Sequence, residues 1–235
     1  MNTLYVVMPA YNEEANIEAV IRQWYPVLSM GSEDSRLVIA DSGSSDRTHE
    51  IIEGLKENGY PQLTAYSDTL KQHGPKVIAL YKYAIDNGAD FVFQTDSDGQ
   101  TNPDEFGQFW EMRNAYDAIF GVRTVRGDGK SRKFVENVVC FLLRCYFGVK
   151  VKDANAPFRL FNTAVLNKYV GRFDEDYNLP NIMLTTFYTY YHENCSFREI
   201  TFKPRQGGVN SINIRKIVKI GWKALGDFRR FKKSM

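Results

Sequence analysis

Short apolar runs alternate with segments of helical periodicity through the first half of the chain. The apolar runs predict strands at residues 4–7, 37–40, 63–66, 91–94 and 116–121. Apolar residues at helical spacing predict helices at residues 14–28, 46–55, 76–87 and 103–114. This alternation is typical of an α/β protein, whose mostly parallel sheet carries helices on both faces.

Polar residues follow four of these predicted strands, at the point where each strand ends. They are residues 9–13, 41–46, 96–100 and 121–123. Parallel strands present their carboxyl ends at one edge of a sheet, and ligands bind beyond that edge. We therefore expect the four segments to meet at one rim.

Asp96 and Asp98 carry the most informative chemistry of this rim. Carboxylates one residue apart at the end of a strand point to the same side of the chain. Their charges repel unless a cation neutralises them. Mg²⁺ or Mn²⁺ suits such oxygen ligands and would also hold a diphosphate. The alternative is an acidic turn, because Asp and Gly are ordinary turn residues.

After residue 123 the pattern changes. Helical periodicity returns at residues 131–147 and 181–192, residues 196–203 predict a strand, and Gly207 and Gly208 mark a loop. No internal repeat, low-complexity segment or linker separates the two halves. We therefore predict one domain over residues 1–235, with a specialised second half.

Composition sets limits on the protein class. The 235-residue chain is 43% apolar and 25% charged, as in an ordinary soluble globular protein. Its best apolar run, Val138–Leu143, falls well short of the roughly 20 residues that a membrane helix needs. Cys140, Cys145 and Cys195 are too few and too irregular for a disulfide framework or a zinc site. A strand begins near the N-terminus, so no signal peptide is evident and we predict a cytoplasmic protein.

The end of the chain is strongly basic. Residues 215–235 hold eight Lys or Arg and one Asp, although the whole chain has a net charge of only +2. Apolar residues recur among these cations at helical spacing. Such a helix can lie on an anionic membrane surface, or it can pack its apolar face on the protein body. Nucleic acid binding fits less well, because no reader motif accompanies the charge.

The motifs, taken in order, resemble family 2 glycosyltransferases of the GT-A fold. The resemblance lies first in residues 6–14, 38–46 and 96–98. Within the family the likeness is closest to dolichyl- and polyprenyl-phosphate sugar transferases. The signs of that subgroup are Gln100 and residues 121–123 and 153–159.

The resemblance implies a role for individual residues. It implies that the nucleotide site is lined by Pro9, Tyr11, Glu13 and Asp41. It implies that the metal ion and the donor diphosphate are held by Asp96, Asp98 and Gln100. The residues that it places in the catalytic centre are Asp96, Asp98, Arg123, Arg132 and Asp153, with the two arginines on phosphates. The residues that it places on the acceptor side are Arg159, Asp174, Asp176, Arg205 and Ser211.

The resemblance also divides the single domain. Residues 1–123 form the half that binds the nucleotide sugar, residues 124–214 the acceptor half, and residues 215–235 the basic amphipathic helix. Two positions depart from the family pattern. Ser42 stands where a second Asp is common, and Glu136 stands where lipid-phosphate members tend to have Ser.

Several of these residues also have ordinary structural interpretations. Asp41 and Asp46 could cap a helix, and for Asp46 we favour that interpretation. Tyr11 could be a packing residue, or it could present its ring to a base. Arg123 could pair with a structural carboxylate, although its place at a strand end favours a phosphate contact. His73, like the other two histidines, has no evident partner and is expected at the surface.

Together these observations predict a hexosyltransferase that inverts the sugar and needs a metal ion. The donor is a GDP- or UDP-sugar, and the acceptor is a polyprenyl phosphate at the cytosolic membrane face. A second possibility is a sugar hydroxyl acceptor, with Asp174 or Asp176 as the general base. Another class is a non-catalytic nucleotide-sugar binding protein. A nucleotidyltransferase is a poorer match, because its glycine-rich loop near the first strand is absent.

Overall fold

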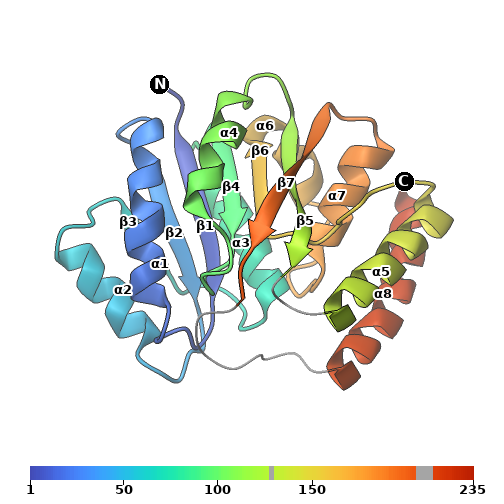
Figure 1. The fold of residues 1–235 in the computed structure, drawn as a ribbon, viewed down its shortest axis with the longest axis horizontal. Coiled ribbons are helices and arrows are strands. Elements are labelled where there is room, and N and C mark those ends of the chain that lie inside the picture. Colours follow the sequence, from blue (N-terminus) through green and yellow to red (C-terminus); the bar gives the residue numbers. More distant parts are fainter. Residues whose placement is uncertain (127–129, 205–213) are drawn as a thin grey trace.

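A seven-stranded sheet forms the centre of the computed structural model, which describes residues 1–126, 130–204 and 214–235. The strand order is β3-β2-β1-β4-β6-β5-β7, and only β6 runs antiparallel to its neighbours (Figure 1). The strands are β1 (Leu4–Ala10), β2 (Arg36–Asp41), β3 (Leu63–Tyr66), β4 (Phe91–Thr95), β5 (Ala118–Arg126), β6 (Phe158–Asn162) and β7 (Cys195–Phe202). The predicted mostly parallel α/β sheet is confirmed.

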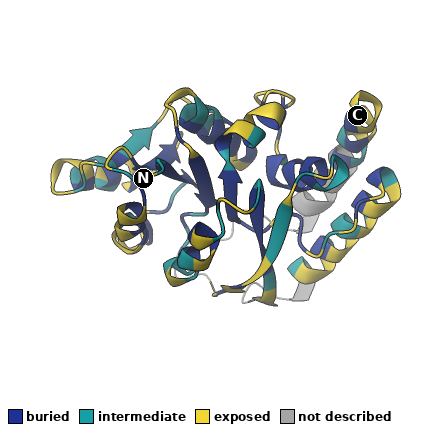
Figure 2. Ribbon diagram, turned by 90° about the horizontal axis from the view of Figure 1, so that it is seen from above, coloured by how far each residue is buried: buried dark blue, intermediate teal, exposed yellow. Residues whose placement is uncertain are grey.

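Helices cover both faces of the sheet, which is buried between them (Figure 2). One face carries α1 (Ile17–Trp24), the 3-10 helix η1 (Tyr25–Met30), α2 (Thr48–Glu57), the 3-10 helix η2 (Pro103–Glu105) and α4 (Phe106–Glu111). The other carries α3 (His73–Asp86), α5 (Lys130–Phe147), α6 (Thr163–Val170), α7 (Pro180–Tyr190) and α8 (Ile214–Ser234). Successive residues of a strand, such as Val6 and Val7, therefore enter different apolar clusters.

Two elements escaped the sequence analysis, namely β6 and the helix α6 that follows it. β6 is five residues long and includes Arg159, so its apolar run is interrupted by a charge. Asn162 at its end is an N-cap whose side chain accepts from the backbone amides of Ala164 and Val165. Asn162, as a residue type favoured at helix N-caps, is the feature of the sequence from which α6 could have been predicted. The predicted helix over residues 14–28 is instead α1 followed by η1, whose second residue is Pro26.

The helices α5 and α8 lie side by side at one end of the molecule (Figure 1). The ring of Phe228 on α8 packs 5.7 Å from that of Phe147 on α5. Ala224, Phe228 and Phe231 are buried in the apolar cluster beneath. The C-terminal part of the basic helix therefore packs its apolar side on the body. No helix in the described part of the chain is long and apolar enough to cross a membrane.

Gly74 in α3 is required by a close backbone contact. A Cβ atom there would lie 2.4 Å from Asn178 Cα and 2.5 Å from the Tyr177 carbonyl oxygen. We expect Gly74→Ala to lower the free energy of unfolding by about 1–3 kcal/mol, because the backbone at residues 177 and 178 must move to make room for the new atom. Gly54→Ala in α2, where nothing lies within 4 Å of the new atom, should raise it by about 0.5–1 kcal/mol. Urea denaturation measures both, and equal effects would contradict the contact.

Candidate active site

The polar segments that follow β1, β2 and β4 are tied to one another by hydrogen bonds. The Ser97 hydroxyl donates to the Pro9 carbonyl at 2.8 Å. The backbone amide of Asn12 donates to the Ser44 hydroxyl at 3.0 Å, and that of Glu13 donates to the Thr48 hydroxyl at 2.8 Å. The structure therefore brings three of the four predicted segments to one rim. The fourth prediction is wrong in its strand end, because residues 121–123 lie within β5 and do not follow it.

Asp96 and Asp98 lie at this rim on the turn after β4, both half-buried. His73, the first residue of α3, places its Nε2 atom 3.1 Å from Asp96 Oδ1. Partial loss of solvent at the rim opposes protonation of the half-exposed His73 ring, but the Asp96 carboxylate outweighs it and raises the pKa of His73. The rings of His73 and His49 are both exposed, as expected, but the expectation that they have no partner is wrong, because His49 Nδ1 also lies 3.8 Å from Asp41 Oδ2. Periodicity could not reveal these contacts, because each joins two separate segments.

The donor set of the turn fits a hard divalent cation. No three His, Cys, Asp or Glu side chains gather into a metal cage among the described residues. Mg²⁺ and Mn²⁺ need no such cage, since one or two carboxylates can suffice where a substrate phosphate supplies further oxygens. Asp96 and Asp98 could provide those carboxylates.

Gln100 has a structural role in addition to its predicted place at the metal. Its buried side chain donates from Nε2 to the Lys203 carbonyl at 2.8 Å. In return the Lys203 amide donates to the Gln100 carbonyl at 2.8 Å. The amide nitrogen of Gln100 is thus engaged with the end of β7, and its Oε1 atom is the one that a metal could use.

Two lysines lie on the nucleotide side of the rim, within residues 71–76, a segment that resembles the donor-side loop of family members. The buried Lys76 ammonium donates to the Ala10 carbonyl, and burial lowers its pKa to about 8, against the influence of Asp41. The Lys71 and Lys76 nitrogens lie 4.7 and 5.4 Å from the centre of the Tyr11 ring. Positive charge therefore surrounds Tyr11 at the rim.

The remaining predicted nucleotide residues are held firmly by the protein. Asp41 is buried and accepts a hydrogen bond from Ser44, and Glu13 is buried and accepts from Asn16 at 2.8 Å. Pro9 is buried within β1. The N-cap of α2 is Arg47, so the favoured assignment of Asp46 as the cap is one residue too early. Asp46 still accepts from the backbone amide of Thr48, the first helical residue, at 3.1 Å.

Arg123 forms a buried ion cluster, as its structural interpretation predicts. Its Nε and Nη2 atoms donate to both Asp153 oxygens at 2.8 and 2.9 Å, and Glu136 Oε2 lies 3.5 Å from Nη2. Burial opposes ionisation of Asp153, but hydrogen bonds from Arg123 hold its pKa below the ordinary value. Burial and the neighbouring Asp153 raise the pKa of Glu136. A phosphate contact by Arg123 would compete with this bidentate pair.

Arg159, which the resemblance places on the acceptor side, is buried in the interior. Its guanidinium donates to protein oxygens at 2.6 to 2.9 Å, namely the carbonyls of Ala154, Ala156 and Asn181 and the Thr185 hydroxyl. Burial lowers its pKa to about 10. The guanidinium thus joins the turn before β6 to α7, so any effect of Arg159 on an acceptor has to be indirect.

The other acceptor-side residues separate into three groups. Asp174 is exposed and pairs with Arg230 on α8. Asp176 is exposed on the same loop, which reaches the first turn of α3 where Asn178 contacts Gly74. Arg132 is half-buried on the first turn of α5. Arg205 and Ser211 lie outside the described residues.

Comparison with known proteins decides the family. A family model described as glycosyl transferase family 2 matches residues 5–170, more than two thirds of the chain. The chain belongs to glycosyl transferase family 2. This family 2 glycosyltransferase is 24% identical over 185 residues to the undecaprenyl-phosphate 4-deoxy-4-formamido-L-arabinose transferase of Pectobacterium carotovorum subsp. carotovorum, covering 77% of this chain and 55% of that protein. The enzyme of that name from Pseudomonas aeruginosa is 25% identical over 162 residues, covering 68% and 47%. The chain thus spans about half the length of these relatives.

Solved structures agree on the fold of this family 2 glycosyltransferase. Glucosyl-3-phosphoglycerate synthase of Mycobacterium tuberculosis, in complex with UDP, gives a TM-score of 0.69 at 17% identity, covering 99% of this chain and 80% of that one. The complex of that enzyme with Mn²⁺, UDP-glucose and glycerol 3-phosphate gives 0.64 at 18% identity, covering 97% and 76%. The predicted GT-A fold is confirmed.

The buried cluster makes a specific prediction for stability. Arg123→Met should lower the free energy of unfolding by about 3–5 kcal/mol at pH 7, because it leaves Asp153 buried without its guanidinium. The depressed pKa of Asp153 stabilises the native protein above its unfolded pKa of about 4, and this contribution is lost as the pH falls. The difference in the free energy of unfolding between the wild type and the variant should therefore become smaller in acid.

Urea denaturation at pH 7 and in acid measures this difference. Lys168→Met is the matched control, because Lys168 makes an exposed ion pair with Glu193 and should cost less than about 1 kcal/mol. A variant at Arg123 that keeps wild-type stability at pH 7 but loses donor affinity would favour the phosphate contact instead.

Proposed function

We propose that the chain transfers a sugar from a nucleoside diphosphate sugar to a polyprenyl phosphate, with inversion and with Mg²⁺ or Mn²⁺ bound at Asp96 and Asp98. The observation that carries the proposal is the placement of these two carboxylates at the rim that joins β1, β2 and β4. The names of the curated relatives support the lipid-phosphate acceptor. The UDP-glucose complex of the similar structure supports a UDP-sugar as the first donor to test, ahead of a GDP-sugar.

The chemistry needs charge compensation at the leaving diphosphate. A divalent ion, when bound, supplies that compensation and orients the diphosphate. Asp96 and Asp98 would hold it, with the side-chain Oε1 atom of Gln100 as a further ligand. Lys71 and Lys76 add positive charge on the nucleotide side, 4.7 and 5.4 Å from the Tyr11 ring. This leaves Tyr11, Glu13 and Asp41 to orient the nucleoside.

The residues of the second half act differently in this proposal. Arg123 and Asp153 position β5 and the turn before β6 through their bidentate pair. Arg132, on the first turn of α5, is the arginine that we assign to a phosphate of the donor or the acceptor. An acceptor phosphate is already ionised near neutral pH, so its oxygen can attack the anomeric carbon without a protein base. We place the protein at the cytosolic face of a membrane, where such an acceptor is reached.

A hydroxyl acceptor is the second candidate, and it requires a general base. Of the two aspartates considered, Asp174 is paired with Arg230, whereas Asp176 lies on the loop that contacts Gly74 at the start of α3. Asp176 is therefore the better candidate for this role.

The metal pair is tested by replacing both carboxylates with amides of the same shape. Asp96→Asn with Asp98→Asn should abolish the Mn²⁺-dependent thermal shift given by UDP or GDP. The same change should slow sugar transfer to a polyprenyl phosphate at least about 100-fold, because several kcal/mol of charge stabilisation is lost. Nucleoside diphosphate release reports turnover.

Asp104→Asn serves as the matched control, since Asp104 is an exposed carboxylate in the next segment of the chain. It should leave both readouts unchanged. Transfer and metal affinity that survive in the double variant would refute the assignment. Tight diphosphate binding by the wild type without any turnover would point to a binding protein.

The acceptor class is tested at Asp176. Asp176→Asn should change transfer to a polyprenyl phosphate by less than about threefold, because this acceptor needs no base. For a hydroxyl acceptor the loss should be about 100-fold or more. The comparison uses kcat with each acceptor at saturating donor, and a large loss with the lipid phosphate would contradict our preferred acceptor.

A further inference from the structure

The outer face of α5 carries an apolar stripe that is exposed to solvent. Phe134, Val138 and Phe141 are 68%, 40% and 64% exposed. Their spacing of four and three residues places them along one side of the helix. The large apolar side chains exposed in the described part of the chain are Met1, Met30, Leu70, Phe134, Val138 and Phe141, so half of them lie on this stripe.

The fold itself does not need these side chains. The opposite side of α5 supplies its packing, through Leu143 and Phe147 in the apolar cluster and Glu136 in the ion cluster. Two exposed phenylalanine rings on one helix face are uncommon for a surface that meets only water. We therefore expect another molecule to cover the stripe.

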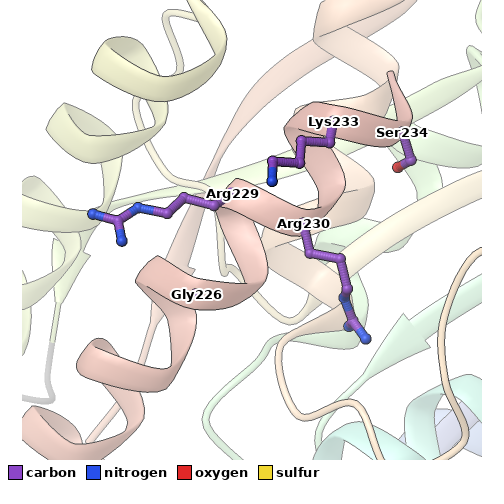
Figure 3. A pocket seen from close by; sticks show the side chains of 5 residues that line it. All are labelled: Gly226, Arg229, Arg230, Lys233 and Ser234. Atoms are coloured by element: carbon purple, nitrogen blue, oxygen red, sulfur yellow. The ribbon is translucent and has the colours of Figure 1, made fainter.

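Positive charge borders the stripe on both sides. Lys133 and Arg144 are exposed on α5 itself, and helical spacing puts them together on one flank. The other flank faces α8, because Tyr146 of α5 packs 6.1 Å from the Phe228 ring. The exposed side of α8 carries Arg229, Arg230 and Lys233, which line a shallow depression. Arg229 and Arg230 point to opposite sides of α8, and Arg230 is the one that pairs with Asp174 (Figure 3).

Acidic groups offset only part of this charge. Arg230 lies beside Asp174 and Asp227, and those two carboxylates exceed its charge by one. Lys133, Arg144, Arg229 and Lys233 outnumber that one remaining negative charge. Lys232 lies over the Tyr190 ring at 4.7 Å, next to the same helix pair. The stripe and its borders thus combine an apolar centre with a cationic surround.

We propose that the α5 stripe inserts into an anionic lipid surface, with the cations of α5 and α8 on the headgroups. An apolar face bordered by Lys and Arg is what interfacial helices present to anionic bilayers. A second copy of this chain is a worse occupant, because a symmetric contact would bring the same cations against each other. The proposed function supplies the reason for such docking, which would hold the active site near a lipid-borne acceptor. The lipid contact itself rests on the stripe and its cations alone.

The test is vesicle binding by the full chain without a sugar donor. The wild type should sediment with vesicles of equal parts phosphatidylcholine and phosphatidylglycerol, and much less with phosphatidylcholine alone. Phe134→Gln with Phe141→Gln should weaken binding roughly tenfold or more, because both rings lose their apolar environment. Gln keeps helix propensity. Met30→Gln, at an exposed apolar residue on η1, is the control and should bind like the wild type.

Other outcomes would overturn the inference. These are a wild type that ignores anionic vesicles, a double variant that binds as tightly, or a wild-type dimer that the double variant dissociates. If the double variant does not fold, Phe141→Trp decides. Its added fluorescence should shift to the blue on anionic vesicles and be quenched by brominated lipid, and no change would refute insertion.

A separate assay keeps the two proposals distinguishable. Transfer to a short-chain, water-soluble polyprenyl phosphate should be the same in the wild type and in the double variant. Loss of that activity in the double variant would show that the stripe serves catalysis rather than docking, and would overturn the inference. Absence of the activity in the wild type would count against the proposed function, while vesicle binding would still decide the inference.

Discussion

The central constraint on this structure is the gathering of carboxylates at one edge of a parallel sheet. Asp41 ends β2 and Asp96 follows β4, and parallel strands deliver both to the same rim as β1. Like charges so placed raise the energy of the native state unless cations accompany them. The start of α3 provides two, because His73 meets Asp96 and the buried Lys76 faces the charge of Asp41. One helix thereby offsets charge from two strands.

A second electrostatic constraint attaches the rest of the chain to this sheet. Arg123 on β5, Glu136 on α5 and Asp153 before β6 form a cluster in which one guanidinium faces two carboxylates. Full ionisation would leave a buried negative charge, and the raised pKa of Glu136 is the physical consequence. Separating Arg123 from its carboxylates leaves an unpaired charge in the interior. The cluster therefore restricts the position of α5 on the sheet more than apolar packing alone would.

The sequence predicted those features that depend on neighbouring residues. The rim, the Asp96 and Asp98 pair and most strands follow from local pattern, and the structure has them where they were expected. Contacts between segments far apart in the chain could not be predicted from the sequence. Arg159 has the pattern of a surface residue, yet it is buried, and its guanidinium donates to backbone carbonyls of the turn before β6 and of the first turn of α7. The same holds for His73 with Asp96 and for Arg123 with Asp153, where the sequence shows each charge but not its partner.

The two interpretations of the basic tail are compatible once the packing of α8 is known. Phe228 and Phe231 are buried in the core, so the apolar side of this part of α8 cannot contact a membrane. Its cations stay outside, since burial of unpaired charge is costly. Charge alone binds a bilayer weakly and reversibly, and insertion needs apolar surface. In the described part of the chain the apolar surface next to α8 is on α5, which is why the docking argument moves from the tail to the neighbouring helix.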